Sequence, residues 1–225
     1  MEDEAERVGA VYEGYGRSAR RARSWSAANA GNRLIREEIV AAIRAAAPEL
    51  DRPPGDILDI GCGTGWWLRE LAAAGVPPGR LHGVDLLRPR VEAARGALPG
   101  AEIREGDARA LPWPDASFWL VTLFLVLSSE DSAESQRRSL AEARRVLAPG
   151  GHLFVWEPRV PNPGNRATRH VSRRTLGRAL GPGLRVTKVT VLPPLARRLV
   201  RSREGYARLG RTGALCTHRL AHLRS

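Results

Sequence analysis

The segment Asp59-Ile60-Gly61-Cys62-Gly63-Thr64-Gly65 decides the fold. It follows a short apolar run, residues 56–60, of the kind found in a strand buried on both faces, and it precedes a helix-like stretch near residues 66–74. Glycines at three alternate positions permit a tight turn and let a ligand approach the free backbone amides at the start of the helix. The sequence therefore predicts a strand, a ligand-binding loop and a helix in that order.

The same alternation of strands and helices continues along the chain. An amphipathic helix is predicted over residues 31–46 ahead of the first strand, since apolar residues recur there at spacings of three and four. Further strands are predicted at residues 81–84, 101–105, 118–127, 153–156, 184–192 and 214–220, and further helices near 89–97, 132–147 and 168–180. Strands that alternate with helices favour βαβ crossovers, so we predict an α/β fold with a parallel sheet.

Length and composition indicate one globular domain in a chain of 225 residues, of which 43% are hydrophobic. The longest apolar run, residues 118–127, is far shorter than the roughly 20 residues that a membrane span needs. The acidic start, residues 1–4, does not resemble a secretory signal, so we expect a cytoplasmic protein. Because Cys62 and Cys216 are distant and lack a CxxC or Cys/His pattern, we expect neither a disulfide framework nor a metal site.

Charge is distributed unevenly along the chain. Residues 1–159 hold 21 Arg/Lys and 23 Asp/Glu, a net −2, whereas residues 160–225 hold 15 and 1, a net +14. Clustered positive charge attracts acidic ligands, lipid headgroups or nucleic acid, so the C-terminal part is predicted to face an anionic partner. A purely compositional origin is the alternative, because Lys188 is the only lysine and the chain uses arginine throughout.

A carboxylate follows the predicted second strand. Asp85 stands 20 residues after Gly65, at the place where an acidic side chain can accept hydrogen bonds from both ribose hydroxyls of a nucleoside. A nicotinamide cofactor and an S-adenosylmethionine cofactor both fit this arrangement. The glycine spacing separates them, since the loop is GxGxG and not GxGxxG.

Five ordered motifs resemble those of the class I methyltransferases and together cover about residues 55–157. They are residues 59–65, the first motif; Gly83-Val84-Asp85, the second; Gly106-Asp107-Ala108, the adenine-contacting motif; and residues 111–118 and 145–151, which lead into strands four and five. The resemblance implies a Rossmann-like, doubly wound, mostly parallel seven-stranded sheet with helices on both faces and an antiparallel last strand. It also implies an S-adenosylmethionine-dependent methyltransferase.

By that resemblance, Asp59 helps to position the methionine amino group, Asp85 takes the ribose and Asp107 meets the adenine. The residues expected to bind the cofactor are Asp59, Gly61, Gly63, Gly65, Asp85, Leu86, Asp107, Ala108 and Leu123. The chain departs from the family at Trp119, where an aspartate often follows the phenylalanine. We expect that change to affect packing beside the strand rather than chemistry.

No histidine stands at the end of strand four to act as an obvious base. The sulfonium donor is already activated, so holding the acceptor in line with the methyl group can supply much of the acceleration. A hydroxyl acceptor would still benefit from a base, and Glu130, Glu157 and His218 are the candidate catalytic residues by their expected location. The alternative for each is an exposed or structural polar residue.

The predicted organisation is an N-terminal arm or lid, residues 1–30, that includes Trp25, and a single methyltransferase domain, residues 31–225. Its cofactor half spans about residues 55–157, and its basic acceptor-side half spans about residues 158–225. Arginines in the loops after strands five and six, residues 157–166 and 193–201, would border the active-site mouth.

The basic C-terminal part favours an anionic small-molecule acceptor. The chain, including residues 25–32, the Pro-Asn-Pro-Gly-Asn loop at 161–165 and Thr217-His218, also resembles a bacterial subgroup of these enzymes whose members often stand beside genes for cell-surface polysaccharides, which implies a sugar or lipid-linked glycan acceptor. An apolar stripe of Leu195, Leu199, Tyr206 and Leu209 beside arginines would suit a helix at a membrane surface or one packed on its own sheet. The alternatives are an RNA methyltransferase, supported only by the C-terminal charge, and a catalytically silent cofactor-binding protein.

Overall fold

A seven-stranded sheet forms the centre of the computed structural model, which describes residues 5–10, 29–160, 168–199 and 202–225. The strand order is β3-β2-β1-β4-β5-β7-β6. The strands are β1 (Ile57–Ile60), β2 (Leu81–Asp85), β3 (Glu102–Glu105), β4 (Phe118–Phe124), β5 (Leu147–Pro158), β6 (Arg185–Val191) and β7 (Cys216–Arg224). The first five strands pair in parallel and β7 is antiparallel to both of its neighbours. This confirms the predicted Rossmann-like fold.

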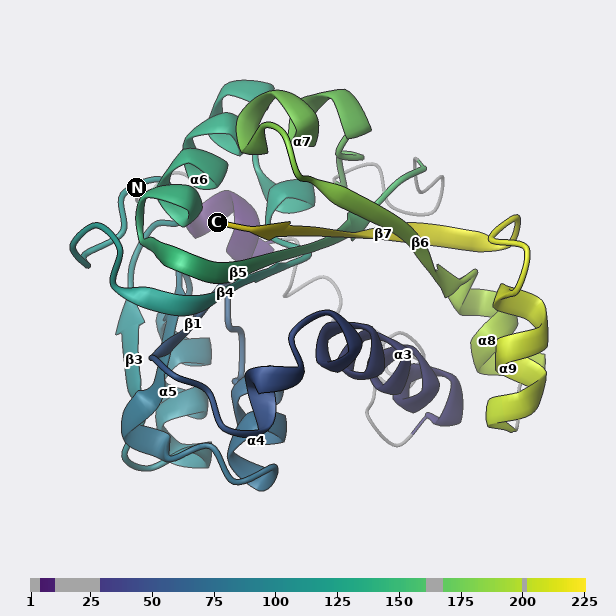
Figure 1. Ribbon diagram of the computed structural model, residues 1–225, viewed down its shortest axis with the longest axis horizontal. Coiled ribbons are helices and arrows are strands. Elements are labelled where there is room, and N and C mark those ends of the chain that lie inside the picture. The colour runs from purple at the N-terminus through teal and green to yellow at the C-terminus, as the bar shows by residue number, and fades with distance from the viewer. Residues whose placement is uncertain (1–4, 11–28, 161–167, 200–201) are drawn as a thin grey trace.

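Helices cover both faces of the sheet (Figure 1). They are α3 (Ala30–Ala46), α4 (Trp66–Ala73), α5 (Arg88–Ala97), α6 (Ala133–Arg145), α7 (Arg173–Leu180), α8 (Pro193–Leu199) and α9 (Arg203–Gly210), with 3₁₀ turns η1 (Pro48–Asp51), η2 (Pro78–Arg80) and η3 (Leu127–Ser129). Figure 1 shows α6 and α7 on one face, α3, α4 and α5 on the other, and α8 and α9 beside the end of β6. Residues 5–10 form a further short helical segment.

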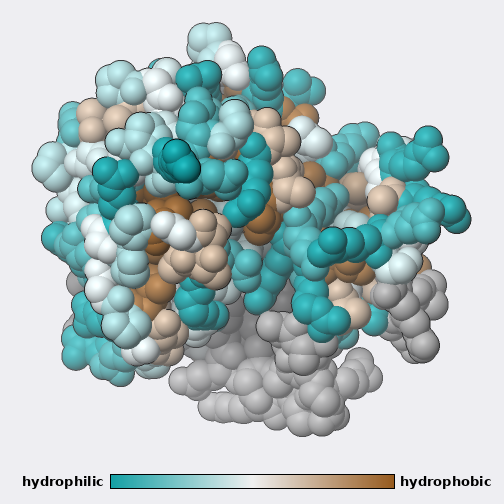
Figure 2. Space-filling view, turned by 60° about the horizontal axis from the view of Figure 1, so that its bottom comes forward, coloured by the Kyte–Doolittle hydropathy of each residue, from teal (hydrophilic) through white to brown (hydrophobic). Residues whose placement is uncertain are grey.

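Two apolar clusters hold these layers together, one on each face. Every residue of β1 and β4 is buried, because both strands lie inside the sheet under helices. Successive side chains of a strand point to opposite faces, so Ile57 packs in the cluster with α3 and α4, and Leu58 in the cluster with α6 and α7. Polar side chains cover most of the face seen in Figure 2, between small apolar patches.

The C-terminal part differs from the prediction in detail. The last strand runs to Arg224 and the fifth begins at Leu147, because the segment between α6 and the body of β5 already pairs with β4. The apolar stripe after β6 is divided between α8 and α9, and the Tyr206 side chain is buried against the protein's own core. In the described residues, no helix is long and apolar enough to cross a membrane.

Candidate functional site

A cavity of about 280 Å³ opens at the carboxyl ends of β1, β2 and β4, where ligands bind in sheets of this kind. Its lining comes from the glycine loop after β1, the ends of β2 and β4, the loop after β3 and the η3 turn. The lining residues are Val8, Asp59, Gly61, Cys62, Gly63, Thr64, Trp66, Val84, Asp85, Leu86, Arg90, Gly106, Asp107, Ala108, Arg109, Phe124, Leu125, Val126, Ser129 and Glu130. Seven of the nine predicted cofactor residues are among them.

Two predicted cofactor residues lie outside the lining. Gly65 is the residue before α4 and has a φ of +75°, so it terminates the loop in a left-handed conformation that favours glycine. Leu123 is fully buried within β4 and contributes to the core. For these two positions the structure shows a role in the loop and in the packing rather than at the cavity wall.

The glycine loop is shaped by its backbone conformation. Gly61 has a φ of +67°, and a Cβ added there would overlap Cγ2 of Val126 on the neighbouring loop. Gly63 has a φ of +56°, but the nearest atom to its added Cβ would be 3.9 Å away. Gly61 is therefore required by both conformation and space, whereas Gly63 is required by conformation alone.

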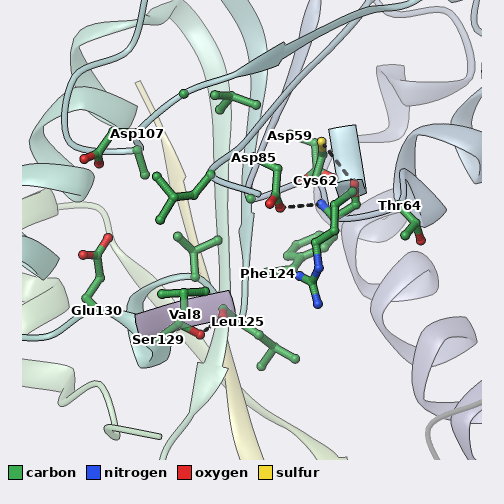
Figure 3. Close-up of a pocket in the computed structure, with 18 of the residues that line it drawn as sticks. Val8, Asp59, Cys62, Thr64, Asp85, Asp107, Phe124, Leu125, Ser129 and Glu130 are labelled. Atoms are coloured by element: carbon green, nitrogen blue, oxygen red, sulfur yellow. Dashed lines mark hydrogen bonds between the residues drawn. The ribbon is translucent and has the colours of Figure 1, made fainter. Parts of the chain in front are cut away.

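Asp85 fastens two loops to each other. Its Oδ2 accepts a hydrogen bond of 2.8 Å from the amide of Gly63, and its Oδ1 accepts one of 3.0 Å from the amide of Leu87. The carboxylate thus lies between the glycine loop and the start of α5, with its edge at the cavity (Figure 3). This is the position from which a carboxylate can accept hydrogen bonds from a ribose.

Asp59 is a buried acid at the end of β1, with 2% of its surface exposed. Its Oδ1 accepts a hydrogen bond of 2.7 Å from Thr122. Burial raises the pKa of Asp59 to about 7, against that hydrogen bond and with help from the nearby charge of Asp85. A cation beside this carboxylate would stabilise its ionised form, so the site fits an ammonium group such as the amino group of S-adenosylmethionine.

Asp107 lies across the cavity from Asp59 and Asp85 (Figure 3). Arg109 binds it through a hydrogen bond of 2.7 Å from Nη2 to Oδ2 and two of 3.0 Å from Nε. Partial burial raises the pKa of Asp107, but the hydrogen bonds and charge of Arg109 outweigh burial and hold the pKa below its ordinary value. Asp107 therefore presents a fixed carboxylate. Arg109 is not among the predicted site residues, although its spacing of two residues from Asp107 is visible in the sequence.

Of the three candidate bases, Glu130 lines the cavity. Its side chain is buried, and Oε1 accepts a hydrogen bond of 2.7 Å from Oγ of Ser139 on α6. Figure 3 shows this carboxyl on the same side of the cavity as Asp107. It is the candidate base that the fold brings to the site.

Glu157 lies outside the cavity lining and holds the η3 turn. It is fully buried at the end of β5, and its two oxygens accept hydrogen bonds of 2.7 Å from the amide of Leu127 and 3.2 Å from the amide of Ser128. Burial raises the pKa of Glu157 to about 8, against these hydrogen bonds. Its role in the structure is to position the turn that carries Ser129 and Glu130.

His218 also lies outside the lining, on β7. Its ring packs 5.3 Å from the ring of Trp156, and its Nδ1 lies 3.0 Å from Oγ1 of Thr217. Burial, and then the charge of Arg197, lowers the pKa of His218 to about 4. The imidazole is therefore neutral at pH 7. The ring of Trp156 contacts both His218 and Phe124, and Phe124 is part of the cavity wall, so Trp156 separates the imidazole from that wall.

Two aromatic side chains form part of the wall. The rings of Trp66 and Phe124 are 5.9 Å apart and inclined by 28°, and the guanidinium of Arg36 lies 4.9 Å from the Trp66 ring centre. Such surfaces bind flat, apolar groups. Neither residue is among the predicted site residues, because only the tertiary structure brings the start of α4 beside the end of β4.

The helical segment 5–10 lies over the cavity. Val8 is a lining residue (Figure 3). The guanidinium of Arg7 donates a hydrogen bond to the carbonyl oxygen of Ser129. Trp25 and most of the predicted arm or lid lie outside the described residues.

Trp119 belongs to the packing. Its side chain has 8% of its surface exposed and meets the ring of His152 edge-on at 5.3 Å. Its amide donates to the carbonyl oxygen of Asp56, which precedes β1, so the residue lies at the amino end of β4, opposite the cavity. The departure from the family pattern at this position is therefore remote from the cofactor loop.

Comparisons with known proteins agree with this geometry. Residues 57–151 match a protein family described as a methyltransferase domain. An uncharacterized 37.1 kDa protein in a transposon of Streptomyces fradiae is 42% identical over 113 residues, which are 48% of this chain and 32% of that protein. Demethylmenaquinone methyltransferase of Chlorobaculum parvum is 38% identical over 127 residues, 55% of this chain and 49% of that enzyme. The chain thus spans a third to a half of the length of these relatives.

A solved structure shows the same fold over nearly the whole chain. It is an S-adenosylmethionine-dependent methyltransferase from Thermotoga maritima, with a TM-score of 0.63 and 19% identity, covering 99% of this chain and 98% of that one. The motifs, the sheet order and the matched segment therefore agree. Residues 57–151 are similar to a methyltransferase domain, and the fold of the chain is that of the solved S-adenosylmethionine-dependent methyltransferase.

Proposed function

We propose that the protein transfers the methyl group of S-adenosylmethionine to a small-molecule acceptor that carries a flat ring and a negative group. The observation that supports the donor is the placement of Asp59, Asp85 and Asp107 around one cavity beside the glycine loop. The buried carboxylate of Asp59 suits the amino group of the donor. The carboxylate of Asp85, held by two amides, suits the ribose, and that of Asp107, held by arginine, suits the adenine.

The support for a ring-bearing acceptor is the aromatic wall. Trp66 and Phe124 line the same cavity as the three carboxylates. The relatives named demethylmenaquinone methyltransferase and ubiquinone/menaquinone biosynthesis C-methyltransferase act, by their names, on quinone-type compounds. A quinone-like or other aromatic ring is the acceptor chemistry that the wall and these names favour, with sugar and lipid-linked acceptors as the competing class.

The bound cofactor would supply a methyl group already activated by its positive sulfur. The protein's residues would then bind the donor and the acceptor and orient them for the transfer. Asp59 and Asp85 would fix the donor, Trp66 would hold the acceptor ring, and Glu130 would accept the proton that the acceptor loses. Ser139 donates to Glu130 and so orients its carboxyl group for that task.

Calorimetric titration with S-adenosylmethionine and with NAD tests the donor. We expect binding of S-adenosylmethionine alone, and its loss in Asp85→Ala and Gly63→Val. Binding of NAD, or of neither ligand, would refute the proposal. Methyl transfer to a demethylated quinol, compared with transfer to acidic glycans and to RNA, then tests the acceptor class. Turnover of any of them excludes a catalytically silent protein.

A further inference from the structure

Arg219 lies on β7 with its side chain toward the face that α7 covers. Its neighbours of the same parity, Ala221 and Leu223, pack in the core cluster that includes Leu176 of α7. Its Nη1 is buried and has no hydrogen-bond partner, and its Nη2 is 3.5 Å from the carbonyl oxygen of Arg159. A buried guanidinium N–H without an acceptor is costly, so an acceptor is expected there.

Arg159 follows β5 and is held firmly beside Arg219. Its amide donates a hydrogen bond of 2.9 Å to the carbonyl oxygen of Thr217, and its Nη1 donates one of 2.8 Å to that of Cys216. The guanidinium is thus fixed over the start of β7, and the carbonyl oxygen of the same residue is the one that lies near Nη2 of Arg219.

Arg173, the first residue of α7, is the third arginine of a cluster that includes Arg159 and Arg219. The amide of Val171 donates a hydrogen bond of 3.2 Å to the carbonyl oxygen of Pro158, which brings the start of α7 to the end of β5. Burial, and then the charges of Arg159 and Arg173, lowers the pKa of Arg219. The positive charges of Arg159 and Arg173 therefore both act on the guanidinium of Arg219.

No carboxylate neutralises this cluster among the residues that the structure describes. The ion pairs found there involve none of Arg159, Arg173 and Arg219. Glu157, the strand partner of Arg219, has both oxygens engaged by the amides of the η3 turn. Three neighbouring cations without an acid cost free energy in the unliganded protein, and a bound anion removes that cost.

We propose that Arg159, Arg173 and Arg219 bind a phosphate or similar doubly charged oxyanion group carried by the methyl acceptor. Guanidinium groups suit this ligand because their N–H groups match the oxygens of phosphate in pairs. The segment that precedes Arg173 reaches the rim of the cavity: the amide of Arg169 donates to the carbonyl oxygen of Ser128 at 2.9 Å, and the next residue, Ser129, lines the cavity. The inference rests on the proposed function for the identity of the ligand.

Titration of the whole protein with inorganic pyrophosphate and with inorganic phosphate, followed by calorimetry and by thermal unfolding, tests the subsite without any methyl transfer. We expect saturable binding that weakens at least tenfold in Arg219→Gln and in Arg173→Gln, and less in Arg219→Lys, which keeps the charge but loses the paired N–H groups. Arg178→Gln is the matched control, since Arg178 is an exposed arginine of the same helix. It removes the same charge and should leave the affinity unchanged.

Equal weakening by Arg178→Gln and Arg219→Gln would overturn the proposal, because it would indicate general attraction to a basic surface. The absence of pyrophosphate binding in the folded wild type would also overturn it. The same holds for RNA binding that depends steeply on salt and is unchanged in Arg219→Gln. Binding of S-adenosylmethionine is measured in the same variants. Its retention with loss of pyrophosphate supports the subsite, whereas its absence in all proteins refutes the donor assignment and leaves the anion result standing.

Discussion

The amide of Gly63 donates a hydrogen bond of 2.8 Å to Oδ2 of Asp85, so the first two sequence motifs are joined directly. The carboxylate that is expected to bind the ribose also fixes the loop that is expected to admit the cofactor. Loop shape and cofactor affinity therefore depend on the same side chain.

Asp85→Asn is expected to weaken S-adenosylmethionine binding at least tenfold. An asparagine keeps the volume but offers one acceptor atom, so it cannot accept from both Gly63 and Leu87. Calorimetry measures the affinity. Glu92→Gln, at an exposed position of α5, is the control and should bind like the wild type. Equal affinity in both variants would contradict the role of Asp85.

Gly61→Ala is expected to destabilise the protein by roughly 2–3 kcal/mol, and Gly63→Ala by about 1 kcal/mol. Both have a positive φ, but only at Gly61 would the new Cβ overlap Val126. Urea unfolding of the two variants gives the difference. Adding Val126→Ala should recover part of the loss in Gly61→Ala and none in Gly63→Ala. The reverse order of stability would show that space at Gly61 does not matter.

The unliganded protein is expected to lose stability as the pH rises from about 5 to about 8. Burial raises the pKa of Asp59 to about 7 and that of Glu157 to about 8, so the folded state binds these protons more tightly than the unfolded state does. The resulting stabilisation is present at low pH and is lost through the folded pKa, at up to about 1.4 kcal/mol per pH unit for each group.

Glu157→Gln should flatten that dependence on the alkaline side, since glutamine does not titrate. Urea unfolding at several pH values measures the slope, and Glu92→Gln should keep the wild-type slope. A slope that is unchanged in Glu157→Gln would show that Glu157 is ionised throughout this range.

Deletion of residues 1–28 is expected to weaken S-adenosylmethionine binding several-fold. It removes Val8 from the cavity wall and Arg7 from Ser129, while Asn29 remains to cap α3. The unfolding midpoint without cofactor reports whether the remaining domain is intact. An intact domain with unchanged affinity would eliminate the lid.

Trp66→Leu is expected to raise the KM for a ring-bearing acceptor about tenfold with little effect on the dissociation constant of S-adenosylmethionine. The substitution removes the ring that faces Phe124 but keeps an apolar side chain. Steady-state kinetics on the quinol acceptor, with calorimetry of the donor, separates the two effects. An unchanged KM would place the acceptor away from this wall.

The sequence predicts the sheet because the signals for its strands and loops lie in residues that are close together in the chain. Periodic apolar residues, the glycine loop and Asp85 at the end of the second strand each follow from neighbouring positions in the chain. The same is true of Asp59 and Asp107, which come directly before or after turns at the carboxyl edge.

The features that the sequence did not predict depend on contacts between distant segments. The position of Glu157 at the end of β5 suggests a base, but the sequence gives no sign that its two oxygens accept hydrogen bonds from the amides of η3. Thr190 adopts a φ of +65°, which a β-branched residue rarely does, because the amide of Thr190 donates to Glu38 of α3 and its hydroxyl accepts from Trp156. Neither arrangement has a signal in the local sequence pattern.

Because β7 is antiparallel to its neighbours, its end lies away from the cavity, and this determines where a label or tether can be attached without disturbing the site. Ser225 exchanges backbone hydrogen bonds with Gly150 and Gly151, at the amino edge of the sheet, whereas residues 5–10 lie over the cavity at the carboxyl edge. A fluorophore or surface tether attached after Ser225 would stand on the side away from the cofactor loop. One attached within residues 5–10 would stand beside the cavity, and the same label would then report on cofactor entry.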